Sequence, residues 1–162
     1  MKKLLSALLV LVMLLSLPGI GALAASDGLT WSLDKKGTLT ISGKGEMPDY
    51  SGDTPPWEKY RDDIKAVVIE KGVTHIGAQC FQFCTKLKSV TIPSSVESIG
   101  AAAFYRCEKL SAVYYGGTAS DWDEIEIARY NKRLTSAELV FSDAETPAPA
   151  SSGKPSAGSK LK

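Results

Sequence analysis

The stretch that decides the fold covers residues 64–110 and reads IKAVVIEKGVTHIGAQCFQFCTKLKSVTIPSSVESIGAAAFYRCEKL. It contains one apolar pattern written twice, and each position returns after 23 residues. The core positions that return are Val67, Ile69 and Phe81, which become Val90, Ile92 and Phe104. A fixed period of this length is typical of a solenoid, in which every repeat forms one rung stacked on the previous one. The pattern therefore defines an architecture, and it contains no sign of catalysis.

Each repeat is expected to contain a short strand, a turn and a short helical turn. The two apolar residues of each strand are two positions apart, so both side chains fall on one face. Ala78, Phe81 and Cys84 have three-residue spacing, which favours a helical turn that places the aromatic ring in the core. Gly77 and its counterpart Gly100 are expected to adopt a backbone conformation that a β-carbon would oppose.

The same apolar pair occurs beyond the two clear repeats. The pairs along the chain are Leu39/Ile41, Val67/Ile69, Val90/Ile92, Val113/Tyr115 and Leu139/Phe141. We therefore predict about five rungs, with atypical rungs at the ends. Alternating residues at 29–33 and 38–41 predict a β-hairpin that caps the N-terminal end. Thr118 and Asp121 have the spacing of a capping box and predict a helix, which together with the last strand caps the C-terminal end.

The predicted fold is an α/β-type solenoid of short parallel strands and short helical turns. Its expected parts are a signal peptide at 1–24, an N-terminal capping region with a degenerate first rung at 25–63, the repeats at 64–117, a C-terminal cap at 118–143 and a disordered Pro/Ala/Ser/Lys tail at 144–162.

The N-terminus has the features of a secretory signal peptide. Lys2 and Lys3 precede an apolar run from Leu4 to Leu17, and Ala22 and Ala24 offer a small-residue cleavage site. The run is too short for a comfortable transmembrane span. We therefore expect a secreted or cell-surface protein that does not span the membrane after cleavage.

Charge excludes some classes of partner. The chain has 19 basic and 18 acidic residues, and removal of Lys2 and Lys3 leaves 17 and 18. A nearly neutral protein is not expected to bind nucleic acid or an anionic membrane through charge. The sequence predicts no cofactor and no metal, and we expect a monomer.

The three cysteines are Cys80, Cys84 and Cys107. Export permits disulfides, but an odd number of cysteines is not a disulfide framework. Cys84 and Cys107 occupy the same place in adjacent rungs, about 4.8 Å apart, which a disulfide tolerates. Buried, reduced thiols are the favoured interpretation, and a Cys84–Cys107 disulfide is the alternative.

Residues 87–110 fit LxSVTIPSSVxSIGxxAFYxCxxL, which resembles the BspA-like leucine-rich repeat of bacterial secreted and surface proteins. The resemblance extends to the segments before and after the repeats. These are Trp31-Ser-Leu33, 37–43, Met47-Pro48, Pro56-Trp57 and Tyr60-Arg61 on one side, and 113–117, Asp121-Trp122 and Asn131-x-x-Leu134 on the other. The resemblance implies a short right-handed leucine-rich-repeat solenoid. It also implies protein binding or adhesion to host or matrix proteins, without catalytic residues.

The first candidate site is the outward side of the strands. The middle residue of each apolar pair points away from the core, and these residues are Thr40, Val68, Thr91, Tyr114 and Val140. Solenoids commonly bind ligands on such a surface, and we include Tyr105, at a variable position of the repeat, as a second aromatic contact. The alternative is that valine stands at these positions only because it favours strands.

The second candidate site is the loop after the hairpin, as a carbohydrate- or wall-binding surface. Its residues are Glu46, Asp49, Tyr50, Asp53 and Trp57, which could bind a sugar or a cation. The plainer interpretation is a flexible polar loop.

Two weaker patterns bear on enzymatic activity. His75, the only histidine, pairs with Cys80 as a nucleophile dyad on paper, but no third orienting group is evident. The acidic run that contains Asp121, Asp123, Glu124 and Glu126 lacks the spacing of a calcium loop and indicates a helix cap with a solvated face. We therefore expect a protein that is not an enzyme.

Overall fold

The structure is a computed structural model that describes residues 20–26 and 28–141. The strands are β1 Ile20–Ser26, β2 Leu29–Leu33, β3 Thr38–Gly43, β4 Gly45–Glu46, β5 Ala66–Ile69, β6 Val73–Ile76, β7 Ser89–Ile92, β8 Ser98–Ile99, β9 Ala112–Tyr115, β10 Glu126–Ile127 and β11 Glu138–Phe141. The helices are the 3-10 helix η1 Glu58–Tyr60, α1 Ala119–Asp123 and α2 Lys132–Thr135. The expected tail at 144–162 lies outside the described residues.

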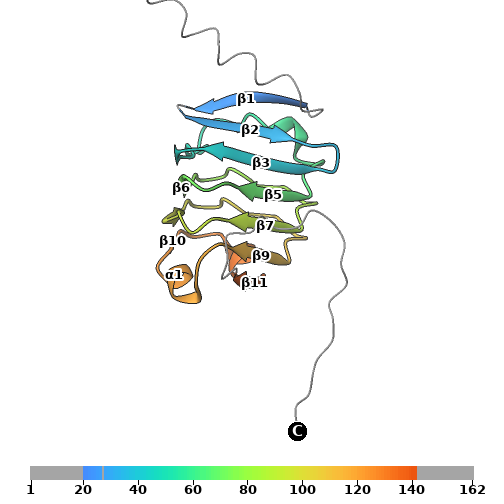
Figure 1. Ribbon diagram of the computed structural model, residues 1–162. Coiled ribbons are helices and arrows are strands. Elements are labelled where there is room, and N and C mark those ends of the chain that lie inside the picture. Colours follow the sequence, from blue (N-terminus) through green and yellow to red (C-terminus); the bar gives the residue numbers. More distant parts are fainter. Residues whose placement is uncertain (1–19, 27, 142–162) are drawn as a thin grey trace, which may run out of the picture.

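Strands from successive repeats lie side by side in the sheets. Within the described residues, one sheet has the order β1-β2-β3-β5-β7-β9-β11 and a second has the order β10-β8-β6-β4 (Figure 1). From β3 to β11 the neighbours in the larger sheet are parallel. The predicted parallel-strand solenoid is confirmed, and its handedness stays a prediction.

The register confirms that equivalent residues lie above one another. The column of inward positions runs Leu39, Val67, Val90, Val113 and Leu139, each paired with the next. The first four of these side chains are buried, as are Ile69 and Ile92. Parallel pairing without slippage is expected here because a shift of one residue would turn the whole apolar column to solvent.

One aromatic ring from each repeat fills the centre of the stack. Phe81 and Phe104 are fully buried, and their ring centroids are 5.2 Å apart with an interplanar angle of 27°. Trp57 continues the stack on the other side of Phe81, at 5.7 Å and 17°. The predicted core positions are therefore confirmed, and the rings form a continuous column from the N-terminal region into the second repeat.

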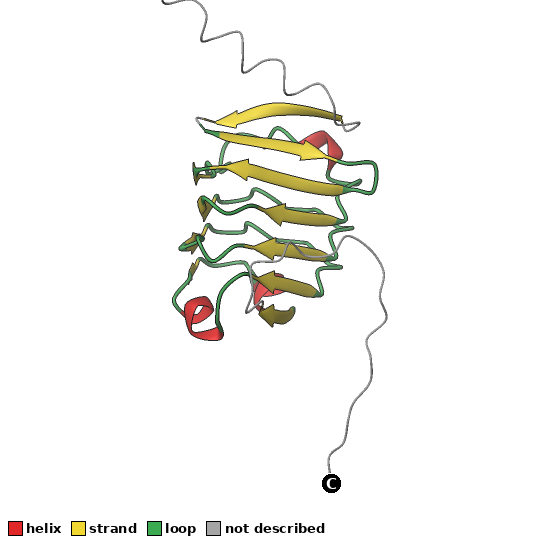
Figure 2. Cartoon of the chain, viewed as in Figure 1, coloured by secondary structure: helices red, strands yellow, loops and turns green. Residues whose placement is uncertain are grey.

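The predicted helical turn in each repeat is wrong. Residues 77–88 contain turns and no helix, and the helices of the described residues lie before β5 and after β9 (Figure 2). The N–H groups of Gln79, Phe81 and Phe83 donate to the carbonyls of 101, 103 and 105 in the next rung, over 3.1, 2.9 and 2.8 Å. Every second amide therefore bonds between rungs, whereas an α-helix would use its amides within the segment. Three-residue spacing fits both arrangements, since each places the ring inward.

Gly77 and Gly100 are required for a different reason from the one predicted. Neither has a positive φ angle. A β-carbon on Gly77 would overlap the carbonyl of Pro48, and one on Gly100 would overlap the backbone of Ala78. Glycine is needed because the backbones of neighbouring rungs approach closely at this corner.

At the N-terminal end, β2 and β3 pair antiparallel, and β1 pairs antiparallel with the outer edge of β2. The predicted hairpin of 29–33 and 38–41 is confirmed, and in the uncleaved chain β1 lies outside it. Most of the expected leader lies outside the described residues, but its last residues, Ile20 to Ala24, belong to β1. Cleavage after Ala24 would remove most of this strand and leave β2 as the edge.

At the C-terminal end, two polar side chains bond to backbone groups. Asp121 accepts from the N–H of Thr118 over 2.8 Å, and the Thr118 hydroxyl accepts from the N–H of Asp121 over 3.2 Å, which confirms the capping box of α1. The buried Asn131 accepts from the N–H of Phe104 over 3.0 Å and donates to the carbonyls of Gly100 and Ala128, both over 2.9 Å. In the previous rung the corresponding amide, that of Phe81, donates to a backbone carbonyl. Asn131 thus replaces the carbonyl of a further rung.

Candidate interaction surfaces

The five predicted strand-face residues form one column. The register pairs Thr40 with Val68, Val68 with Thr91, Thr91 with Tyr114 and Tyr114 with Val140. Their side chains point away from the core because the inward positions alternate with them. We call this column the strand face, and the alternating pattern of each strand is the reason that it forms.

The strand face is uncharged, and it becomes more exposed toward the C-terminal end. Thr40, Val68 and Thr91 are half-buried, whereas Tyr114 and Val140 are each 38% exposed. The interstrand hydrogen bonds hold the backbone beneath these side chains in place. The face therefore offers a rigid strip of hydroxyl and apolar groups that ends in an exposed aromatic ring.

Tyr105 does not belong to the strand face, which corrects the predicted grouping. It lies in the turn segment that follows β8, outside the large sheet. Its ring contacts Phe83 at 5.9 Å and Tyr130 at 6.5 Å between centroids. Phe83 and Tyr130 are 44% and 62% exposed, so the three rings form a second surface that sequence reasoning missed.

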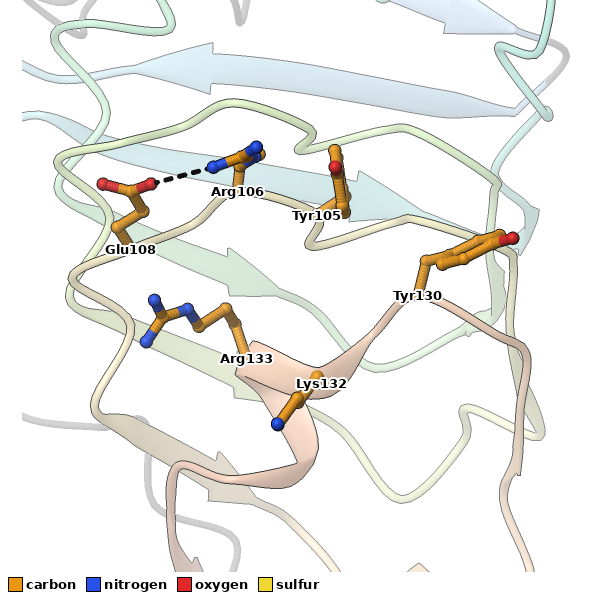
Figure 3. Close-up of a pocket in the computed structure, with 6 residues that line it drawn as sticks. All are labelled: Tyr105, Arg106, Glu108, Tyr130, Lys132 and Arg133. Atoms are coloured by element: carbon orange, nitrogen blue, oxygen red, sulfur yellow. Dashed lines mark ion pairs between the residues drawn. The ribbon is translucent and has the colours of Figure 1, made fainter.

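Basic residues accompany these rings around a shallow cavity of about 210 Å³ (Figure 3). Its lining consists of Tyr105, Arg106, Glu108, Tyr130, Lys132 and Arg133. The guanidinium groups of Arg106 and Arg129 lie over the rings of Tyr105 and Tyr130, at 5.6 and 5.4 Å from the centroids. Such cation–π contacts hold each arginine beside its ring.

The loop after the hairpin does not present the aromatic groups predicted for sugar binding. Trp57 and Tyr50 are buried, and their rings pack edge to face at 6.1 Å. Trp57 also donates its indole N–H to the carbonyl of Cys80 over 2.8 Å. Burial raises the pKa of Tyr50 to about 12. Both rings belong to the core, so neither offers a face on which a sugar could stack.

One acidic residue of the same loop bonds to the backbone of the first clear repeat, and two others are exposed to solvent. Asp49 accepts a hydrogen bond from the N–H of Ala78 over 2.5 Å, and His75 Nε2 lies 3.5 Å from the same carboxylate oxygen. Glu46 and Asp53 are exposed. Asp49 therefore holds the loop against the first clear repeat.

The predicted His75–Cys80 dyad has no geometric support. His75 Nδ1 lies 2.7 Å from the hydroxyl of Ser98, and Cys80 is fully buried with its thiol directed at the carbonyl of Pro48 over 3.6 Å. Burial, with a smaller contribution from Asp49, raises the pKa of the Cys80 thiol far above its usual range. A buried neutral thiol is a poor nucleophile.

The acidic run forms a helix end and one side of a shallow cavity. Asp121 and Glu124 line a cavity of about 220 Å³ together with Glu97. The hydrogen bonds from Thr118 hold the pKa of Asp121 below its usual value. Within the described ranges, no group of three or more potential ligands is placed to hold a metal ion.

All three cysteines lie in the described part of the chain, and all are free and buried. The Cys107 thiol donates to the carbonyl of Phe81 over 3.1 Å. Burial raises the pKa of Cys84 to about 12 and raises that of Cys107 as well. The three thiols are therefore unpaired in the structure, and the Cys84–Cys107 disulfide stays an untested alternative.

The thiols are expected to be unreactive until the protein unfolds. At pH 8 we expect Ellman's reagent to detect no rapid thiol in the native protein and all three cysteines in denaturant. Because the folded state raises their pKa values, the stability that the neutral thiols contribute is present below the ordinary cysteine pKa of about 8.5 and is lost as the pH rises above it. Denaturation at pH 8, 9 and 10 measures this loss, which should be smaller in Cys107→Ala. Rapid labelling of the native protein, or an unchanged pH dependence in that variant, would contradict the assignment.

The parallel rungs, the repeated core ring and the outward strand column define a repeat-solenoid protein with surfaces suited to interaction. A family model described as "BspA type Leucine rich repeat region (6 copies)" matches residues 59–139, and the chain belongs to this family. Leucine-rich repeats of this kind indicate a protein–protein interaction domain.

A solved structure of similar fold is a leucine-rich repeat protein from Eubacterium ventriosum. The match has 40% sequence identity and a TM-score of 0.53, and it covers 56% of this chain and 24% of that chain. The chain therefore corresponds to about a quarter of its structural relative. No curated protein matches the chain. Among the described residues, no helix has the length and apolar character needed to cross a membrane.

Proposed function

We propose that the protein is a secreted, non-enzymatic module that binds an extracellular protein, such as a host or matrix protein, through the strand face. The observation that carries the proposal is the unbroken register of Thr40, Val68, Thr91, Tyr114 and Val140 across five parallel strands. Family membership supports protein binding as the general role.

The physical character of the strand face suits a protein partner. Its five side chains carry no charge, so a partner can cover them without desolvating an ion. The strands beneath them are hydrogen-bonded on both sides from β3 to β9, so little conformational entropy is lost on binding. Tyr114, with 38% of its surface exposed, supplies the kind of aromatic anchor that often dominates the binding energy of an interface.

The proposed secretion and adhesion rest on features of the sequence outside the strand face. The basic start, the apolar run from Leu4 to Leu17 and the small residues before Ser26 favour export. Adhesion follows from export together with a protein-binding surface.

The test is a binding screen of the purified protein against a panel of extracellular matrix proteins and glycans. For any protein that binds, Thr91→Arg should lower the affinity about tenfold or more, because it places an unpaired charge at the centre of the contact. Tyr114→Ala should lower the affinity by removing the exposed ring. Thr85→Arg is the matched control, since Thr85 is exposed in a turn outside the large sheet.

Thermal unfolding of each variant verifies that the fold is intact. If Thr91→Arg and Tyr114→Ala bind as tightly as the unchanged protein, the strand face is not the contact surface. If the screen detects only glycans, protein binding itself is the wrong function.

A further inference from the structure

The surface around Tyr105 combines exposed rings with a local excess of positive charge. We call it the aromatic–basic patch and define it by Phe83, Tyr105, Arg106, Arg129, Tyr130, Lys132 and Arg133. The chain has four arginines, and three of them lie in this patch. The chain as a whole is almost neutral, so the patch is a concentration of charge and not part of a general basic character.

The cations at the cavity are only partly neutralised. Arg106 lies 3.6 Å from Glu108, and both side chains are more than half exposed. Within residues 28–141, neither Lys132 nor Arg133 has a carboxylate at ion-pair distance. Figure 3 shows Arg133 and Lys132 extending from one segment and Arg106 and Glu108 lying on the neighbouring segment across the cavity. Two cations are therefore available to an anionic ligand at this position.

The arrangement of the rings narrows the class of ligand. Phe83 and Tyr105 meet at an interplanar angle of 78°, and Tyr105 and Tyr130 meet at 74°. Neighbouring rings are therefore nearly perpendicular, and the three rings do not form one flat surface. A sugar or a nucleobase stacks best on a flat, open ring face, and the guanidinium groups of Arg106 and Arg129 cover one face each of Tyr105 and Tyr130. A corner between two rings instead suits a branched apolar side chain.

We propose that the aromatic–basic patch binds an acidic peptide segment of a protein partner. Carboxylates of the segment pair with Lys132 and Arg133, the two cations at the cavity without a carboxylate partner among residues 28–141. The planar guanidinium group of Arg133 matches a carboxylate with two parallel hydrogen bonds. An apolar side chain between these carboxylates enters the corner formed by Tyr105 and Tyr130. The patch residues lie in turns and in α2, whereas the strand face lies on the large sheet, so this site stands independently of the proposed function.

The experiment measures fluorescence anisotropy with a short labelled peptide of alternating glutamate and leucine, and with the same peptide carrying glutamine in place of glutamate. The purified protein should bind the glutamate peptide saturably, more weakly as salt rises, and should bind the glutamine peptide much less. The double variant Lys132→Gln/Arg133→Gln should bind about tenfold more weakly, because two exposed ion pairs are lost.

The matched control is Lys35→Gln/Lys36→Gln, which removes the same charge from two exposed residues in the turn between β2 and β3. It should leave the affinity nearly unchanged. Tyr130→Ala should weaken binding without changing the charge, which separates the corner between the rings from simple electrostatic attraction. These residues are exposed, so the thermal midpoints should stay close to that of the unchanged protein.

The proposal would be overturned by a lack of saturable binding of the glutamate peptide, by an equal loss of affinity in the lysine control, or by full affinity in Tyr130→Ala. Polygalacturonate serves as a competitor that carries carboxylates on a sugar backbone. Tighter binding of polygalacturonate than of the peptide would assign the patch to an anionic glycan and would also overturn it.

Discussion

Phe104→Ala is expected to lower the free energy of unfolding by about 3–5 kcal/mol, since the substitution removes a fully buried ring and leaves a cavity. The ring is stacked on Phe81 at 5.2 Å, so its loss also removes an aromatic contact from the central column. Urea denaturation followed by circular dichroism measures the change. The effect should be large relative to the total stability of a small domain.

The control for this prediction is Phe83, two residues after Phe81, which is the equivalent of Phe104 in the first clear repeat. Phe83 is in the same turn segment as Phe81 but is 44% exposed. Phe83→Ala should therefore change the free energy of unfolding by only about 0.5 kcal/mol, as is usual for surface substitutions. Equal losses in Phe104→Ala and Phe83→Ala would mean that the two rings do not differ in burial, and the stacked-column architecture would be wrong.

Asn131→Ala is expected to lower the free energy of unfolding by about 2–4 kcal/mol. The amide side chain holds the N–H of Phe104 and the carbonyls of Gly100 and Ala128, and its removal leaves these backbone groups without their partner. Each buried polar group left unpaired costs about 1–3 kcal/mol, and water that enters the vacated space recovers part of it. Chemical denaturation of the purified variant measures the loss.

Asn131→Leu separates hydrogen bonding from packing. Leucine is similar in size to asparagine but can neither donate nor accept a hydrogen bond. The free energy of unfolding of Asn131→Leu should fall at least as far as that of Asn131→Ala. If leucine restores the stability of the unchanged protein, Asn131 acts by filling space and does not terminate the ladder of rungs.

The core positions of the two clear repeats could be predicted because the same apolar pattern occurs twice in the sequence. Val67 and Val90 lie side by side in the sheet, and Phe81 and Phe104 stack, as the 23-residue spacing requires. Apolar periodicity identifies these positions without any knowledge of the turns. The resemblance to BspA-like repeats predicted the family, which the family match confirms.

The conformation of the turn segment could not be predicted in the same way. Inward side chains at three-residue spacing are compatible with a helix and with the observed turns, so the pattern of Ala78, Phe81 and Cys84 does not separate them. The deciding factor is where the amides donate, and that depends on the next rung. A local signal was present in Gly77 and Gly100, since glycine at a repeated position can indicate a close backbone approach as well as an unusual φ angle.

The candidate sites were harder to predict because exposure depends on the folded chain. Trp57 and Tyr50 look like a sugar-binding pair in the sequence, but both are buried, and Trp57 packs between Tyr50 and Trp31 of the hairpin. The aromatic–basic patch was missed because its rings do not follow the repeat spacing and Tyr130 lies beyond the clear repeats. The available signal was the occurrence of arginine next to tyrosine at both 105–106 and 129–130.

The inter-rung ladder has a consequence for the size of the molecule. Each internal rung makes the same backbone hydrogen bonds and ring contact with the next rung as with the previous one. The contacts inside the stack therefore do not fix the number of rungs. A duplicate of residues 64–86 inserted before Leu87 would lengthen the solenoid by one strand spacing, about 4.8 Å, and leave both terminal segments as they are. Length is thus a property that gene duplication can adjust in equal steps, while the ends decide where the series stops.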